Sequence, residues 1–171
     1  SRGPEILDLF WRMDSGGVNR CYKYPETPWA WTCVPPDGLG LPSAGQGAIA
    51  AISPDPSVMY LFWIGGDGSV WHVKTDDVGL KDEVQSHIAT EWDFQSKVMI
   101  SPTGTADSGG GLAVTKRASG DAYDPQGPGT VQLYWIGSEG SVEVANNFIQ
   151  ASEWKLQPQI AGPGSAAPSS N

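Results

Sequence analysis

The stretch LFWIGGDGSV at residues 61–70 returns, with three conservative changes, as LYWIGSEGSV at residues 133–142. A shorter version, LFW at residues 9–11 followed by Gly17 and Val18, makes a third copy. In both full copies an acidic residue and a Gly separate two runs of strand-forming residues, and Gly tolerates the positive φ of a tight hairpin. Such self-similarity is typical of a repeat architecture, so we expect three related hairpins.

Two further landmarks recur around each hairpin. Small residues form the predicted strands 48–53 and 112–117, ahead of the hairpin. A Trp-containing segment follows it, as EWDFQ at 91–95, EWKLQ at 153–157 and the looser PWAW at 28–31. Each repeat thus predicts a small-residue strand, a strand ending in an aromatic-Trp pair, a Gly turn, a third strand, and a fourth strand ending near the Trp landmark. Four antiparallel strands per repeat indicate an all-β fold, a β-propeller with three blades in this chain.

The three blades form a single module, with repeats at approximately 1–46, 47–110 and 111–171. Segments 75–89 and 118–129 lengthen the second and third repeats and are predicted to be surface loops. The first repeat lacks most of its inner strand, and the chain stops where a further inner strand would begin. Closed propellers need roughly four to eight blades. We therefore expect a second copy to complete a six-bladed ring as a homodimer; the alternative is a fragment of a longer propeller.

Composition excludes some functions. The net charge is −9 and only 17% of residues are charged, which does not suit nucleic-acid binding because phosphates need cationic partners. No apolar run approaches the ~18 residues of a membrane span, so membrane insertion is not expected. No cofactor or metal motif is present. The protein is expected to be secreted or extracellular, with a cytoplasmic location as the alternative.

Cys21 and Cys33 are the only cysteines, and each is predicted to lie on one of two successive strands of the first repeat. A disulfide between them would add on the order of 3 kcal/mol to stability. It would also suit a secreted protein. Two reduced, buried thiols are the alternative reading.

Several segments resemble the blades of bacterial and fungal β-propeller lectins. They are SRGPEILDLFW at 1–11, AAISPDP at 50–56 and the hairpin at 61–71. The resemblance covers essentially the whole chain in three copies, most clearly in the second. It implies non-catalytic carbohydrate binding in clefts between neighbouring blades, with glycans or glycoproteins as partners.

In that family, fucose-binding blades hold the sugar with an Arg on the second strand and a Glu on the third, beneath an aromatic ring. The resemblance places Asp8, Tyr60 and Gln132 at the Arg position of the three repeats. It places Arg20, His72 and Val144 at the Glu position. No repeat keeps the pair, and the first carries the two charges exchanged. A lectin is therefore predicted, but fucose specificity through this pair is not.

Sugar binding needs a flat aromatic face and fixed polar groups. Trp11, Trp63 and Trp135 recur at one position and are interpreted as packing between blades. Trp71 breaks the repeat, because Asn19 and Glu143 stand at the matching positions. The candidate ligand-binding residues are Tyr60, Trp71, His72, Trp92, Asp8, Arg20, Trp29 and Trp154.

Two other functional classes remain open. A hydrolase needs a nucleophile beside an oriented base, but His72 and His87 are the only histidines and no Gly-x-Ser-x-Gly elbow occurs. An enzyme is therefore not expected. A propeller that docks proteins without binding sugar is the stronger alternative, because loss of the Arg/Glu pair suits such a role.

Overall fold

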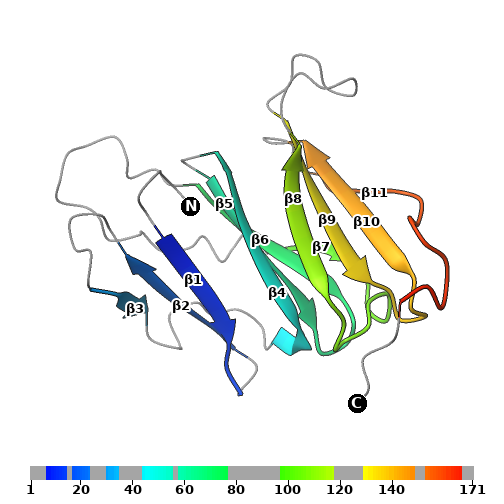
Figure 1. Cartoon of the computed structure of the whole chain (residues 1–171), viewed down its shortest axis with the longest axis horizontal. Coiled ribbons are helices and arrows are strands. Elements are labelled where there is room, and N and C mark those ends of the chain that lie inside the picture. The colour runs from blue at the N-terminus through cyan, green and yellow to red at the C-terminus, as the bar shows by residue number, and fades with distance from the viewer. Residues whose placement is uncertain are drawn as a thin grey trace.

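The computed structural model describes residues 7–14, 17–23, 30–34, 44–55, 58–76, 97–117, 129–148 and 153–166. Within these ranges the chain forms eleven β-strands and no helix. The strands make three antiparallel sheets, in the orders β1-β2-β3, β4-β5-β6-β7 and β8-β9-β10-β11 (Figure 1). The all-β prediction with blade-like sheets is confirmed, and we call these sheets the first, second and third blades.

The strand bounds follow the predicted order. The first blade contains β1 (Leu7–Arg12), β2 (Val18–Lys23) and β3 (Thr32–Val34). The second contains β4 (Ala44–Asp55), β5 (Val58–Gly65), β6 (Val70–Asp76) and β7 (Val98–Ser101). The third contains β8 (Leu112–Arg117), β9 (Thr130–Ile136), β10 (Val142–Phe148) and β11 (Lys155–Leu156). The small-residue strands are confirmed as the inner strands β4 and β8, and β4 begins earlier than predicted.

The repeated Gly turn joins β5 to β6 and β9 to β10. Gly68 and Gly140 both have φ of 72°, a conformation that favours Gly. A loop that follows the fourth strand packs directly on each turn: Ala106 N donates to Gly68 O at 2.9 Å, and Ala166 N donates to Gly140 O at 2.8 Å. A Cβ on Gly68 would lie 2.6 Å from Ala106 O. The turn therefore needs Gly both for its φ and for this close approach.

The side chains of β5 alternate between two hydrophobic cores, as the pleat of a strand requires. The core between the first and second blades contains Met59, Leu61 and Trp63, together with Val18 and Val73. The core between the second and third blades contains Tyr60, Phe62 and Ile64, together with Val131, Leu133 and Trp135. Trp63 and Trp135 are thus packing residues between blades, as predicted.

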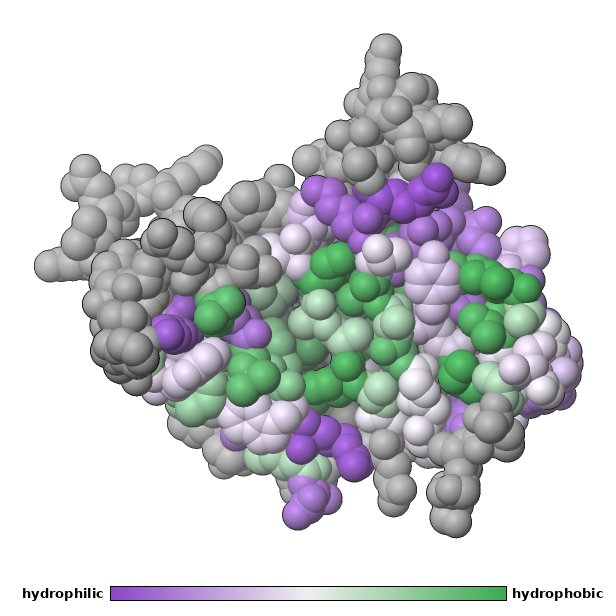
Figure 2. Space-filling view, in the orientation of Figure 1, coloured by the Kyte–Doolittle hydropathy of each residue, from purple (hydrophilic) through white to green (hydrophobic). Residues whose placement is uncertain are grey.

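The inner strands of neighbouring blades lie side by side, with β4 next to β8 (Figure 1). Main-chain bonds also join the second and third blades, because Asp107 N donates to Ile136 O at 2.9 Å and Ser138 N donates to Thr105 O at 3.1 Å. Hydrophobic residues gather over the middle of this face (Figure 2). The blades therefore share both side-chain cores and backbone contacts.

One strand prediction was wrong in the second blade. The fourth strands were expected to end near the Trp landmarks, and β11 ends within the 153–157 landmark, but β7 begins only after the 91–95 landmark. The physical reason is the length of the connection. The long segment after β6 has to be crossed before the chain returns to the sheet, so pairing starts only beyond the landmark.

Both ends of the row of blades present apolar side chains. Leu9 in β1 is 52% exposed, although its repeat counterpart Leu61 is fully buried against the first blade. Ile160 of the third blade is 61% exposed, whereas its counterpart Ile100 is 8% exposed against the third blade. A neighbouring blade covers these positions inside the row, whereas no described residues cover them at its two ends.

No helix in the described ranges combines the length and the apolar character needed to cross a bilayer.

Candidate functional site

Asp8 and Arg20 come together at the junction of the first and second blades. Arg20 Nε and Nη2 donate to Asp8 Oδ1 at 2.9 and 2.5 Å, and both side chains are almost fully buried. The guanidinium also lies over the ring of Tyr22, 4.9 Å from its centroid. Pairing and hydrogen bonding offset the cost of burying the two charges. The exchanged charges therefore bind each other, with a hollow of about 130 Å³ beside Asp8 between β1 and β4.

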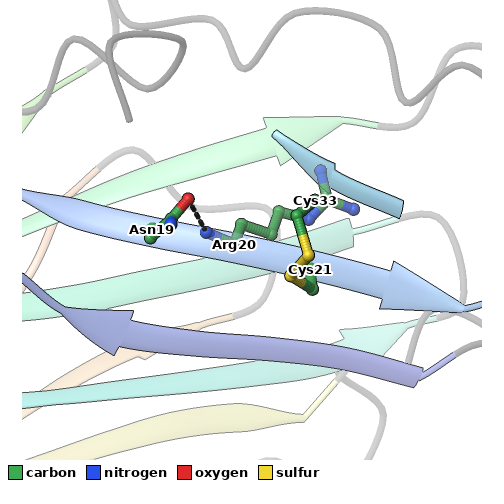
Figure 3. The surroundings of a disulfide bond; sticks show 4 residues. All are labelled: Asn19, Arg20, Cys21 and Cys33. Atoms are coloured by element: carbon green, nitrogen blue, oxygen red, sulfur yellow. Dashed lines mark hydrogen bonds between the residues drawn. A yellow bond between two sulfur atoms is a disulfide. The ribbon is translucent and has the colours of Figure 1, made fainter. Parts of the chain in front are cut away.

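Cys21 and Cys33 form a disulfide in the structure (Figure 3). They are direct partners in the register of β2 and β3, which brings their Cα atoms to 4.0 Å. Arg20 precedes Cys21, and its backbone N–H donates to the Asn19 side chain (Figure 3). The bridge thus holds the two strands beside the Asp8–Arg20 pair.

Tyr60 and His72 belong to a cluster of four rings between the second and third blades. Trp154 supplies one edge: its ring lies 6.3 Å from Tyr60, 5.4 Å from Phe62 and 5.4 Å from His72, centroid to centroid. Tyr60 and His72 are 1% and 5% exposed. The side chains at the Arg and Glu positions of the second repeat therefore pack against each other and against Trp154. Sugar contact by Tyr60 and His72 stays a prediction, and their burial does not favour it.

The imidazole of His72 is held in its neutral form. Neither ring nitrogen has a hydrogen-bond partner among the described residues. Burial, and to a smaller extent the nearby charge of Lys74, lower the pKa of His72 from its ordinary 6.5 to about 4. His72 thus behaves as a packing residue, because a general base needs an oriented and accessible nitrogen.

Trp71 precedes His72 in β6, so its side chain lies on the opposite face of the strand, and it is only partly buried. Its Nε1 donates to Ser69 Oγ at 2.5 Å, and Ser69 in turn is bonded to Asp67. These bonds from Ser69, and one from Thr103, lower the pKa of the Asp67 carboxyl. The turn therefore fixes Trp71, which packs against the core between the first and second blades. The remaining candidates Trp29 and Trp92 lie outside the described residues.

A cavity of about 430 Å³ lies at the junction of the second and third blades. Its volume falls in the range of roughly 300–1,000 Å³ that is typical of ligand pockets. One wall is the loop after β7, with Ser101 and Thr105; the other is the turn end of the third blade, with Trp135 and Leu156. Further polar groups come from Ser138, Glu139, Ser141, Glu143, Gln157 and Gln159.

Glu143 is fixed inside this cavity. Ser141 Oγ and Gln159 Nε2 both donate to Glu143 Oε1, each at 2.6 Å. On the opposite wall the Ser101 and Thr105 hydroxyls are 2.5 Å apart, and Thr105 Oγ1 also donates to Pro102 O at 2.6 Å. Both walls therefore hold oriented polar groups beside an indole and a leucine. Such a lining suits a ligand with hydroxyl groups and an apolar face.

Sequence reasoning missed this cavity, although one signal pointed to it. Glu143 stands where the second repeat has Trp71, and this break in the repeat is visible in the sequence. The lectin resemblance pointed instead to Val144, the next residue, whose side chain lies on the opposite face of the strand. In the part of the chain that the structure describes, no group of three or more His, Cys, Asp or Glu side chains could hold a metal ion.

Solved structures share this architecture. A lectin from Burkholderia pseudomallei matches 94% of the chain with a TM-score of 0.64 and 20% identity. The SapL1 lectin, solved with alpha-methyl fucoside, matches 94% with a TM-score of 0.63 and 12% identity. The fucose-specific lectin from Aleuria aurantia matches 95% with a TM-score of 0.56 and 14% identity. No protein-family model and no curated protein matches the chain.

These identities are low, so the likeness establishes the fold: three blades of a lectin-type β-propeller. The chain spans less than half of each of these lectins, namely 39%, 45% and 43% of their lengths.

Proposed function

We propose that this protein is a non-catalytic carbohydrate-binding protein with glycan sites in the clefts between blades. The observation that supports the proposal is the 430 Å³ cavity at the junction of the second and third blades. It combines an indole, a leucine and oriented hydroxyl, amide and carboxylate groups, in a fold whose solved neighbours include lectins. These are the groups that hold the apolar face and the hydroxyls of a sugar.

Catalysis is disfavoured by the state of the one described histidine. Among the described residues His72 has no hydrogen-bonded carboxylate to orient it, and its ring is enclosed by aromatic neighbours. A triad requires a base hydrogen-bonded both to a nucleophile and to an orienting group. The geometry at His72 therefore supports packing rather than acid–base chemistry.

The predicted clefts can be tested on Trp71 and Trp92, two of the ligand-binding residues that the sequence predicts. Trp71→Ala and Trp92→Ala should each weaken glycan binding about tenfold, because each removes a stacking face. Binding is measured on a glycan array and then by titration with the best glycan. Trp31→Ala is the matched control, since Trp31 is 48% exposed and is not a predicted site residue. If both variants fold and bind like the wild type, these clefts are wrongly assigned.

A protein-docking propeller is the second candidate function. The observation that favours it is the burial of Tyr60 and His72, which stand at the two sugar-gripping positions of the second repeat and pack against each other. A blank glycan array, together with salt-sensitive association with a protein partner, would support this candidate over the first.

We further propose that a second copy of the chain closes the propeller as a homodimer. The support is the pair of exposed apolar ends, with Leu9 at one and Ile160 at the other. The junction of the second and third blades provides the template, because there the counterparts of such residues pack against each other. The Cys21–Cys33 disulfide also favours a secreted or extracellular location.

A further inference from the structure

The cavity between the second and third blades carries a charge pattern that goes beyond general sugar binding. We propose that it selects neutral and positively charged sugars, with amino sugars preferred, and excludes anionic sugars. This inference rests on the proposed carbohydrate-binding function and specifies the ligand class of one site. The inference rests on Glu143, Glu139 and Trp135, none of which is a ligand-binding residue predicted from the sequence.

The first observation is the excess of acceptors. Glu139 and Glu143 both line the cavity, and no Lys or Arg does so among the described residues. The two donors from Ser141 and Gln159 share Glu143 Oε1, so Oε2 accepts no hydrogen bond from the part of the chain that the structure describes. A carboxylate oxygen is thus left for a hydroxyl or an ammonium group of a ligand.

The second observation is an unused donor in the same wall. Trp135 lines the cavity, is 2% exposed, and its Nε1–H has no hydrogen-bond partner among the described residues. A buried donor without an acceptor is costly. Trp63 has the same unpartnered N–H in the second blade, but Trp71 stands there in place of Glu143. The donor is therefore common to the repeat, whereas the carboxylate beside it is specific to the third blade.

The third observation is that the cavity is held in shape before a ligand arrives. Gln159 and Ser141 orient Glu143 from the third blade, while Ser101 and Thr105 bind each other on the second blade. A preorganised negative group discriminates by charge, because it cannot turn away from a carboxylate of the ligand. An ammonium group gains from the same fixed charge.

The test compares three pyranoses of different charge on the wild-type chain: glucosamine, N-acetylglucosamine and glucuronic acid. At about pH 6 the amine of glucosamine is protonated, as expected for an amino group of this kind. We expect glucosamine to bind about fivefold more tightly than N-acetylglucosamine, the gain of a partly exposed ion pair. Glucuronic acid should bind at least about tenfold more weakly than N-acetylglucosamine. Titration calorimetry or ligand-observed NMR measures all three.

Two variants assign the effect to this cavity. Glu143→Gln keeps the size and the hydrogen-bond acceptor, so it should abolish the preference for glucosamine and relieve the exclusion of glucuronic acid. Glu153→Gln is the matched control, because Glu153 is exposed on the same blade and does not line the cavity. Ser138→Trp fills the exposed mouth of the cavity without changing charge and should remove binding of every sugar. Near-UV circular dichroism checks that each variant folds.

The outcomes separate this inference from the function on which it rests. Equal binding of the three sugars, or charge selectivity that survives Glu143→Gln, overturns the inference while carbohydrate binding stands. So does a positive glycan array without binding of any of the three. A blank array and no binding of any pyranose overturn both the inference and the proposed function.

Discussion

The enclosed imidazole of His72 makes the stability of the fold depend on pH. Its pKa is about 4 in the folded chain and 6.5 ordinarily, so between these values the unfolded chain binds the proton more strongly. Stability should therefore fall as the pH falls from 6.5 towards 4, and stay constant above 6.5 as far as this group is concerned. We expect a loss of about 2 kcal/mol between pH 7 and pH 5.

Urea unfolding at the two pH values measures this loss. His72→Phe is the informative variant, because a phenyl ring suits the aromatic surroundings of Tyr60, Phe62 and Trp154 and cannot bind a proton. It should lose most of the difference between the two pH values. An identical pH dependence in wild type and variant would show that another group is responsible.

At the scale of residues, the sequence indicated which side chains are related better than it indicated what those side chains do. It singled out Asp8 and Arg20 as exchanged charges, and the structure brings them within hydrogen-bond distance. It did not anticipate that Trp154 would fill the space beside His72, because packing across blades joins residues 82 positions apart (154 minus 72) without a local signal. Glu143 was noticed only as a break in the repeat, since a strand alternates faces and the alignment followed Val144.

At the scale of elements, two glycines show that a positive φ and a close approach of neighbouring atoms are separate reasons for requiring Gly. Gly68 and Gly104 both have positive φ, 72° and 78°. A Cβ on Gly68 would lie 2.6 Å from Ala106 O, whereas a Cβ on Gly104 would meet nothing within 4 Å. Gly104→Ala should thus lose about 1 kcal/mol from backbone strain alone. Gly68→Ala should lose on the order of 3 kcal/mol, because the main chain must also move.

Chemical unfolding of the two variants against wild type tests this difference. Equal losses would mean that the loop after β7 yields freely and does not hold the turn.

The strand pattern itself was largely predictable. The small-residue run predicted β8 with its observed bounds, and the turn predicted both hairpins, because local periodicity and Gly placement determine such elements. The fourth strand of the second blade was misplaced because β7 is short and follows a long connection, so its position depends on pairing with β6 rather than on its own sequence. The loop that packs on the turn was missed for the same reason.

At the scale of the whole molecule, the exposed ends predict association. If a second copy covers them, native mass measurement should give about 36 kDa, twice the 18.1 kDa of one chain. Leu9→Glu should shift the mass towards one chain, because it places a charge in an apolar interface. Met99→Glu is the control, since Met99 is 48% exposed on β7, away from both ends. A single chain at micromolar concentration in the wild type would contradict closure by a second copy.

The main-chain bonds between the second and third blades affect which substitutions this protein can accept without a change in its fold. Asp107 N and Ser138 N fix the junction through carbonyl groups of Ile136 and Thr105, and neither bond depends on a side chain. The angle between blades is thus set by atoms that every residue type except proline supplies. Side chains at the rim of the cavity can then be exchanged with little disturbance of the scaffold. The junction is consequently a promising place to engineer new ligand preferences, by varying Gln157 and Ser138 while the backbone frame is retained.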